Sequence, residues 1–144
     1  MIILADADKP RTAEDIDKII CAEIPDQNRF PQLYNTVIKS MNHGYCGILN
    51  SNSSCMLDGK CTKNYPKAFA ENTSILNDGY PIYRRRDNGI TFIDGRGNIC
   101  DNRHIVPYNP VLCSIFDAHI NVEYCASIRS IKYVYKYVYK GKYK

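Results

Sequence analysis

One histidine and three cysteines fall in a stretch of the chain that has little else to hold a fixed shape. Residues 43–67 show little hydrophobic periodicity and are rich in Gly, Ser and Asn, a composition typical of irregular loops. The spacing His43-x2-Cys46-x8-Cys55-x5-Cys61 supplies the four nitrogen and sulfur ligands of a closed tetrahedral zinc site. Because zinc ligation contributes folding free energy, we predict a structural zinc site here. The alternative is that some of these cysteines are merely small buried hydrophobic side chains.

The other four cysteines lack the spacing of a metal site. They are Cys21, Cys100, Cys113 and Cys125. Each lies among apolar neighbours, so we predict core thiols. An odd total of seven cysteines fits a reducing compartment better than a disulfide framework. We therefore expect an intracellular protein with free thiols.

Length and composition favour one ordinary globular domain. The chain has 144 residues, of which 24% are charged, with 8 Gly and 7 Pro, and these values exclude disordered and fibrous classes. No segment approaches the ~18 consecutive apolar residues of a membrane-spanning helix. The first ten residues are too short and too acidic for a secretory signal. No membrane partner is expected.

Three helices are predicted from caps and apolar spacing. Thr12-Ala-Glu-Asp15 resembles a capping box, and the helical spacing that follows it runs to Ile20. A second helix is predicted over residues 31–42, which begin with proline and carry apolar residues at helical intervals. A turn with a short helix is predicted within residues 107–116.

Two regions are predicted to be extended. Residues 80–106 contain short β-prone runs separated by Asp-Asn-Gly and Asp-Gly, which predicts an antiparallel hairpin or meander. Residues 118–124 alternate strictly between polar and apolar. This alternation predicts a strand with His119, Asn121 and Glu123 on its polar face.

Together these elements predict an α+β fold, with helices flanking an antiparallel sheet. We expect a single partial domain, because the apolar run at residues 1–4 has no preceding turn or cap. Its expected parts are a strand remnant with two helices (1–42), a Cys/His insert (43–67), a hairpin-rich segment (68–116) and a strand followed by a tyrosine-bearing helix (117–144).

The run KYVYKYVYKG at residues 132–141 fits two structures. As a strand, it places four tyrosines on one face, and tyrosine and valine favour strands. As a helix, it places Tyr133 and Tyr137 one turn apart on a face that also holds Lys136 and Lys140. The glycine that ends the run favours the helix slightly. Two tyrosines so placed can act as covalent nucleophiles on a phosphodiester, and nearby lysines stabilise the transferred phosphate.

A second basic segment contains Arg84, Arg85 and Arg86, close to Tyr80 and Tyr83. Basic side chains with interleaved aromatics suit phosphate contacts and base stacking on single-stranded nucleic acid. A surface strand that carries three arginines explains the segment equally well.

Seven short motifs follow one another along the chain. They are CAEIPD (21–26), HGYCG (43–47), CMLDGKC (55–61), GYPIYRRR (79–86), DNRHIVPYNP (101–110), AHINVEYC (118–125) and KYVYKYVYKG (132–141). In this order, and covering essentially the whole chain, they resemble the Rep region of Helitron Rep-helicase proteins, which belong to rolling-circle transposons. Each string alone is weak, but seven in order are specific.

The resemblance implies a partial HUH-Rep-like fold and an endonuclease that nicks and rejoins single-stranded DNA through a phosphotyrosine intermediate. Tyr133 and Tyr137 would be the nucleophiles, and Lys136, Lys140 and the three arginines would contact DNA phosphates. In that family Mg²⁺ or Mn²⁺ is held by a histidine pair. Glu123 is the first choice for an additional ligand, because such cations prefer anionic oxygen; the alternative is a polar face that meets water. The implied location is the nucleus.

Two parts of such a protein have no counterpart in this sequence. It contains neither a His-x-His motif nor a G-x-x-x-x-G-K-[ST] phosphate loop. We expect the chain to begin at or just after the metal-binding strand, to be separated from the HUH and helicase portions of its parent, and to be inactive alone.

Two non-enzymatic functions also fit the sequence. The chain could be a zinc-stabilised, DNA-binding remnant of a transposon gene that does not cut DNA. A structural zinc module that acts through protein contacts is the third alternative.

Overall fold

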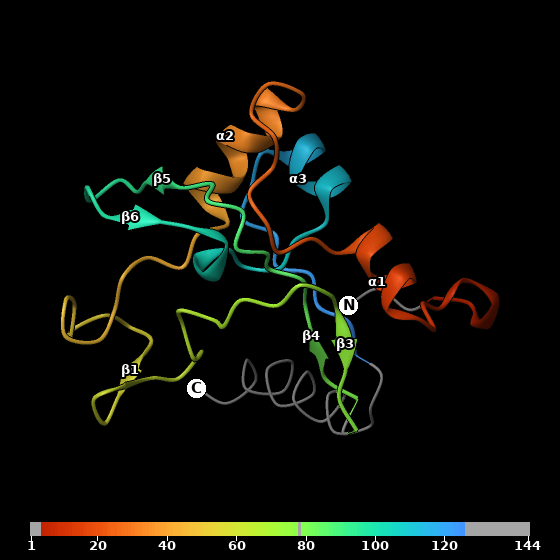
Figure 1. Cartoon of the computed structure of the whole chain (residues 1–144), viewed down its shortest axis with the longest axis horizontal. Coiled ribbons are helices and arrows are strands. Elements are labelled where there is room, and N and C mark those ends of the chain that lie inside the picture. Colours follow the sequence, from red (N-terminus) through yellow and green to blue (C-terminus); the bar gives the residue numbers. More distant parts are fainter. Residues whose placement is uncertain (1–3, 78, 126–144) are drawn as a thin grey trace, which may run out of the picture.

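The computed structural model describes residues 4–77 and 79–125 (Figure 1). Its helices are α1 (Ala13–Ile19), α2 (Pro31–Ser40) and α3 (Pro110–Phe116), with the 3-10 turns η1 (Asp6–Asp8) and η2 (Asn102–His104). Its strands are β1 (Met56–Leu57), β2 (Lys60–Cys61), β3 (Ser74–Ile75), β4 (Pro81–Ile82), β5 (Phe92–Ile93) and β6 (Ile99–Cys100). The predicted α+β class is confirmed.

The three predicted helices are confirmed, and local capping explains where two of them begin. Before α1, Thr12 Oγ1 accepts from the Asp15 amide at 3.1 Å, and the Asp15 carboxylate accepts from the Thr12 amide at 3.3 Å. Before α3, Asn109 accepts from the Leu112 amide at 2.9 Å, and Asp117 ends the helix with a left-handed φ of 45°. Across the described ranges, none of the helices combines the length and apolar character needed to cross a lipid bilayer.

The strands pair antiparallel as β1–β2, β3–β4 and β5–β6, and each pair is a separate two-stranded sheet. The β1–β2 hairpin turns at Asp58-Gly59, with φ of 50° and 74°. Two successive positive φ values are the geometry of a type I′ turn, which Asp-Gly favours. The β5–β6 hairpin lies inside the region 80–106 where a hairpin or meander was predicted.

Two hydrophobic clusters form the interior of the described part. The larger packs α2 and α3 against β5–β6 and contains Ile24, Leu33, Val37, Met41, Phe92, Cys100, Ile105, Tyr108 and Cys113. The smaller surrounds α1 and contains Ile16, Ile20, Ala22 and Tyr83. Neither cluster includes a buried side chain from residues 43–67.

The cysteines outside the Cys/His insert differ in burial. Cys100 and Cys113 are buried and Cys21 is half-buried, so these three fit the predicted core thiols. Cys125 is exposed, and the core prediction is wrong for this residue because its segment runs along the surface. All seven cysteines are free thiols.

The predicted strand at 118–124 is extended but forms only one bridge within the described residues, between Asn121 and Tyr108. The strand prediction is therefore wrong in extent. Its alternation is nevertheless confirmed: Ile120, Val122 and Tyr124 are half-buried, whereas the alternate polar residues His119, Asn121 and Glu123 are exposed. The segment joins the two clusters, because Ile120 packs on the larger and Tyr124 on the smaller.

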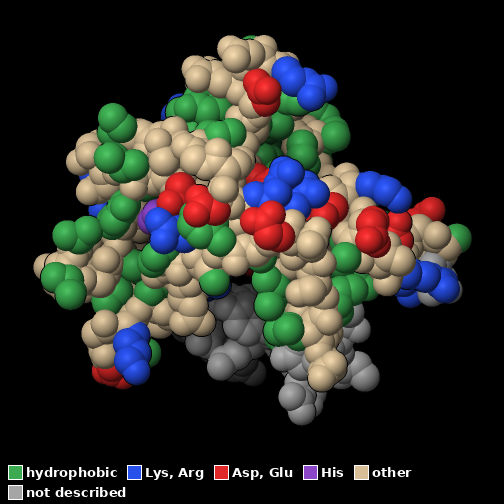
Figure 2. Space-filling model, viewed as in Figure 1, with side chains coloured by type: hydrophobic (Ala, Val, Ile, Leu, Met, Phe, Trp, Pro, Cys, Tyr) green, Lys and Arg blue, Asp and Glu red, His purple; other side chains and the backbone are tan. Residues whose placement is uncertain are grey.

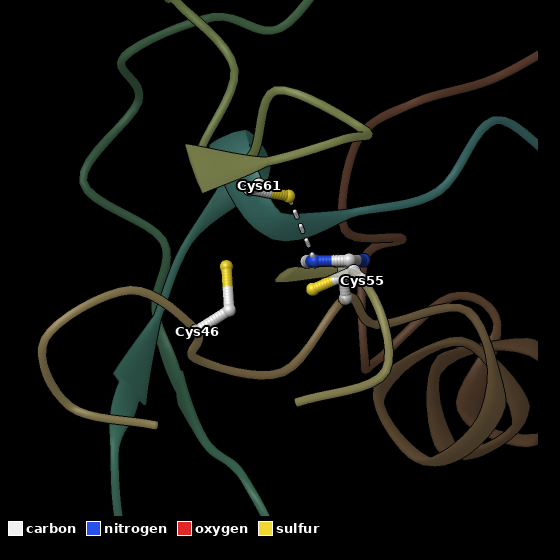
Figure 3. A group of neighbouring side chains, drawn as sticks. Cys46, Cys55 and Cys61 are labelled. Carbon is white, nitrogen blue, oxygen red and sulfur yellow. Dashed lines mark hydrogen bonds between the residues drawn. The ribbon is translucent and has the colours of Figure 1, made fainter. Parts of the chain in front are cut away.

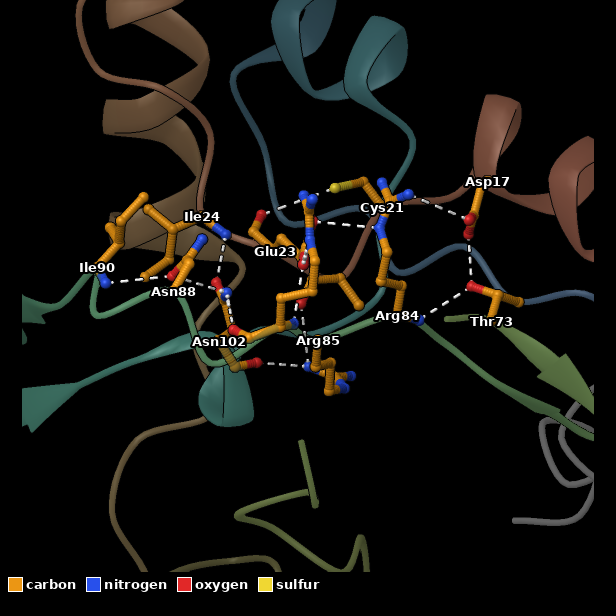
Figure 4. A network of polar contacts seen from close by, with 12 residues as sticks. Asp17, Cys21, Glu23, Ile24, Thr73, Arg84, Arg85, Asn88, Ile90 and Asn102 are labelled. Carbon is orange, nitrogen blue, oxygen red and sulfur yellow. Dashed lines mark hydrogen bonds and ion pairs between the residues drawn. The ribbon is translucent and has the colours of Figure 1, made fainter. Parts of the chain in front are cut away.

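Arg85 connects the irregular segments between the clusters (Figure 4). It is only 4% exposed. Its Nη1 donates to three backbone carbonyls, those of Ala22 at 3.3 Å, Asn102 at 2.7 Å and Ile105 at 2.5 Å. Its backbone also pairs with Ala70 in both directions, at 2.8 and 3.0 Å. Arg85 therefore joins its own segment to Ala22, to Ala70 and to residues 102–105, and these segments share no regular sheet.

Replacing Arg85 with methionine should strongly destabilise the fold. Unsatisfied buried acceptors cost about 1–3 kcal/mol each, so we expect Arg85→Met to lower the free energy of unfolding by at least about 3 kcal/mol. Urea unfolding of the chain measures this. The matched control is Arg96→Met at an exposed turn position, which should change the free energy by less than about 0.5 kcal/mol. Equal stability of the two variants would contradict the role given to Arg85.

Candidate metal centre

The predicted quartet His43, Cys46, Cys55 and Cys61 comes together in space (Figure 3). One nitrogen and three sulfur atoms lie within 4.8 Å of one another. Two of the cysteines are placed by the β1–β2 hairpin: Cys61 belongs to β2, and Cys55 precedes β1. The chain that leaves α2 carries the other two ligands, and the amide of His43 donates to the carbonyl of His104 at 2.8 Å.

One distance between two of the ligand atoms matches the value expected around a tetrahedral zinc ion. Cys61 Sγ and His43 Nε2 are 3.6 Å apart. Tetrahedral coordination with Zn–S of about 2.3 Å and Zn–N of about 2.0–2.1 Å places these two atoms about 3.6 Å from each other. Three thiolates and an imidazole are also the soft and borderline donors that zinc prefers. The residues present therefore fit the metal.

Neighbouring groups orient the ligands. The Tyr65 ring stacks on the His43 ring, with centroids 4.2 Å apart and planes inclined by 14°. The Tyr65 amide donates to Cys61 Sγ at 3.5 Å, and Ser53 Oγ lies 3.3 Å from Cys55 Sγ. Such outer contacts fix ligand orientation and tune metal affinity. Tyr65 has no motif spacing, so only the structure reveals its part in the site.

The pKa shifts of two of the four ligand side chains favour metal binding, and that of a third opposes it. Burial lowers the pKa of His43, which keeps the imidazole neutral and able to bind a metal. Burial opposes ionisation of Cys61, but amide hydrogen bonds from Tyr65 and Lys63 outweigh it and lower its pKa. Burial, together with the neighbouring thiols, raises the pKa of Cys46 to about 12. Zinc would therefore displace a proton from Cys46 on binding.

Four protein ligands leave no coordination position for water or substrate. Catalytic zinc sites keep one position open, whereas structural sites are closed. The quartet therefore supports a structural role.

The other histidines lie elsewhere. His104 is 4% exposed, and its Nδ1 accepts from the Asp101 amide at 3.3 Å. His119 is exposed and contacts the carbonyl of Ser40. Neither belongs to a metal-ligating group within the described ranges.

Glu123 is exposed, and its Oε1 accepts from the Asn121 side chain at 3.2 Å. In the described part, it is not in a group of three or more potential metal ligands. The role of Glu123 as an Mg²⁺ or Mn²⁺ ligand stays a prediction.

The three arginines make different contacts, and Figure 4 labels Arg84 and Arg85 among them. Arg85 points into the interior, as described above. Arg86 Nε and Nη2 donate to the two carboxylate oxygens of Glu23 at 2.9 and 2.7 Å. Arg84 lies 3.4 Å from both Glu23 and Asp17. Arg84 and Arg86 are respectively 36% and 48% exposed at the side chain, so a phosphate contact would compete with these carboxylates.

Asn102 is a structural residue that sequence analysis missed. It is 1% exposed, accepts from the Ile24 amide at 2.8 Å, and donates to the carbonyl of Arg86 at 2.8 Å. The sequence does offer Asp101, which caps η2 immediately before Asn102. A capping aspartate predicts a turn at this place but not the burial of the Asn102 side-chain amide.

The predicted nucleophiles Tyr133 and Tyr137 lie outside the described residues, as do Lys136 and Lys140. Their roles stay predictions. No protein-family model matches the chain, and no curated protein matches it.

Stability should fall in acid partly through Glu23. Burial opposes ionisation of this carboxyl, but hydrogen bonds from Arg86 outweigh it and lower its pKa below the ordinary 4.5. Its contribution is therefore complete above about pH 4.5 and is lost as the pH falls through the lower folded-state pKa. We expect Glu23→Gln to be less stable at pH 7 and to lose less stability between pH 7 and pH 3. Urea unfolding across that range, with Glu14→Gln as the exposed control, checks this; parallel curves for wild type and Glu23→Gln would contradict it.

The chain should bind one zinc ion through the quartet. We expect elemental analysis to give one zinc per chain, and Cys61→Ser to lower zinc affinity at least about 100-fold by removing a thiolate ligand. Co²⁺ in place of zinc should give the absorption bands of a tetrahedral thiolate site. Cys125→Ser, which changes a cysteine outside the quartet, is the control and should keep full occupancy. Full zinc affinity in Cys61→Ser would rule out the assignment.

Proposed function

We propose that this chain is a zinc-organised part of a Helitron-type Rep protein, which nicks and rejoins single-stranded DNA. The observation that carries the proposal is the convergence of His43, Cys46, Cys55 and Cys61 within 4.8 Å. The same cysteines and histidine occur in two of the seven motifs that resemble the Rep region. The metal gives those motifs a physical purpose, which is to order the insert.

Zinc would act as a structural element in this protein. Residues 43–67 contribute no buried side chain to the hydrophobic clusters, so metal ligation is their main source of order. Several contacts join the insert to the rest of the fold. The His43 amide donates to the carbonyl of His104, the Lys67 amide donates to the carbonyl of Arg103 at 3.0 Å, and the Tyr45 hydroxyl donates to the carbonyl of Ile99 at 2.7 Å. The Tyr45 ring also packs against the larger cluster and stacks on His104.

The chemistry would belong to Tyr133 or Tyr137. In the proposed step, the phenolate oxygen attacks a phosphodiester phosphorus, a new O–P bond forms, and the bond to the 3′ oxygen breaks. The products are a 5′-phosphotyrosine and a free 3′ hydroxyl, and a 3′ hydroxyl attacking the adduct reverses the step and rejoins DNA. Lys136 and Lys140 would stabilise the charged phosphate during both steps.

A second candidate is a zinc-stabilised protein that binds DNA without cutting it. The sequence contains no His-x-His motif, and the described residues hold no second metal-ligating group besides the zinc quartet. These observations favour binding without chemistry by this chain alone.

A covalent-adduct assay distinguishes the two candidates. Labelled single-stranded DNA and Mn²⁺ are incubated with the zinc-loaded chain joined to whatever His-x-His segment its reading frame supplies, and label is sought on the denatured protein. We expect Tyr133→Phe and Tyr137→Phe each to reduce the adduct, and the double variant to reduce it at least about 100-fold by removing both nucleophiles. Tyr124→Phe, outside the paired-tyrosine run, is the control.

The assay gives a different result for each candidate function. An undiminished adduct in the double variant would rule out these tyrosines as nucleophiles. Salt-sensitive DNA binding without any adduct would support the second candidate, because phosphate contacts alone give binding of that kind. Absence of DNA binding would contradict both.

A further inference from the structure

The tight turn at residues 47–50 has aliphatic side chains at its apex. Gly47 adopts a φ of 74° and pairs with Asn50, whose amide donates to the Gly47 carbonyl at 3.2 Å. Between them, Ile48 is 103% exposed and Leu49 is 70% exposed. Turn positions of this kind ordinarily carry Gly, Pro, Asn, Asp or Ser. Local conformation therefore does not explain why two exposed aliphatic residues occupy this turn.

The metal centre fixes this turn on both sides. Cys46, a ligand, immediately precedes Gly47, and the Gly47 amide lies 3.2 Å from the sulfur of Met56, which follows the ligand Cys55. The Asn50 carbonyl accepts from the Ser53 amide at 3.3 Å. The apex is thus a short projection held against the β1–β2 hairpin and not a long loose loop.

Positive charge lies on and just after the β1–β2 hairpin, which the turn contacts through Gly47 and Met56. Leu57, 64% exposed, pairs with Lys60 across the hairpin, and Lys63 is exposed two residues beyond β2. The insert carries three lysines and one aspartate, a balance of 3 − 1 = +2. A zinc ion with three thiolates adds one negative charge, so the insert stays positive. Figure 2 shows apolar side chains along the left edge of the molecule, on the side where Figure 1 places both the insert and the β5–β6 hairpin.

We propose that the 47–50 turn is a DNA wedge, in which Ile48 and Leu49 insert between adjacent bases while Lys60 and Lys63 contact phosphates. Ile and Leu are among the residues that separate base steps in other DNA-binding proteins. The choice of DNA rests on the proposed function. It is favoured over a lipid surface because the apex carries no Trp or Tyr, the residues typical of membrane interfaces.

Base unstacking measures the wedge directly. The zinc-loaded full chain is titrated into single-stranded and forked DNA that contain 2-aminopurine, whose fluorescence rises when its neighbours unstack. We expect the wild type to raise the fluorescence and Ile48→Ser/Leu49→Ser to abolish the rise and weaken binding about 10-fold. Zinc content and thermal unfolding should stay unchanged, because both side chains are exposed. Ile93→Ser/Ile99→Ser, which alters an exposed pair of similar size (70% and 65%) on β5–β6, should behave as wild type.

Salt dependence tests the lysines. Lys60→Gln/Lys63→Gln should reduce the slope of log affinity against log salt by about 1.4 on single strands, since each phosphate contact contributes about 0.7. An unchanged slope would exclude these contacts.

Three further outcomes would overturn the wedge, and they differ in what they imply about DNA and lipid as binding partners. DNA binding and 2-aminopurine fluorescence that survive Ile48→Ser/Leu49→Ser would overturn the wedge and leave the proposed function intact. A wild type that binds zinc but no DNA would overturn the DNA-processing proposal as well. Loss of binding to phosphatidylserine vesicles in the same variant, with DNA binding unchanged, would assign the apex to a lipid surface and overturn the wedge.

Discussion

The guanidinium of Arg85 is the interaction on which the described fold depends. Its Nη1 binds carbonyls of Ala22, Asn102 and Ile105, of which Ala22 belongs to the smaller hydrophobic cluster and Ile105 to the larger. With strands of only two residues, no continuous sheet supplies donors to these carbonyls in the described ranges. The buried guanidinium, surrounded by the partial negative charges of these carbonyl oxygens, supplies the hydrogen bonds that neighbouring strands would supply in a sheet.

The neighbouring arginines show how one sequence motif divides into different roles. In an extended segment side chains alternate between faces, and Tyr83 and Arg85 are buried whereas Arg84 and Arg86 reach the surface. Glu23, 6% exposed, lies where both surface arginines can reach it. The backbone path therefore selects which arginine enters the interior, and the carboxylate then holds the other two near the surface.

Local signals in the sequence predicted much of this structure. The capping box at Thr12, the Asp-Gly turn and the alternation over 118–124 involve short-range interactions, so they could be recognised without knowing the fold. The quartet at His43 was also predictable, because metal ligands have restricted chemistry. The burial of Arg85 and Asn102 was not, since their side chains bond to partners 14 to 78 residues away along the chain. Asn102 receives a bond from Ile24, 78 residues distant, and Arg85 reaches back 63 residues to Ala22.

Two parts of the fold are therefore held together by different interactions. Helices and hairpins around the clusters are held by buried apolar surface and by Arg85, whereas the insert has its ligand quartet in place of a hydrophobic core. Within the described residues, hydrogen bonds from His43, Tyr45 and Lys67 connect the two, and the Tyr45 ring packs against the larger cluster. Zinc bound by this quartet would therefore act on the shape of the insert more than on the stability of the core. An exposed aliphatic apex can then be presented rigidly without drawing on the apolar residues that the core needs.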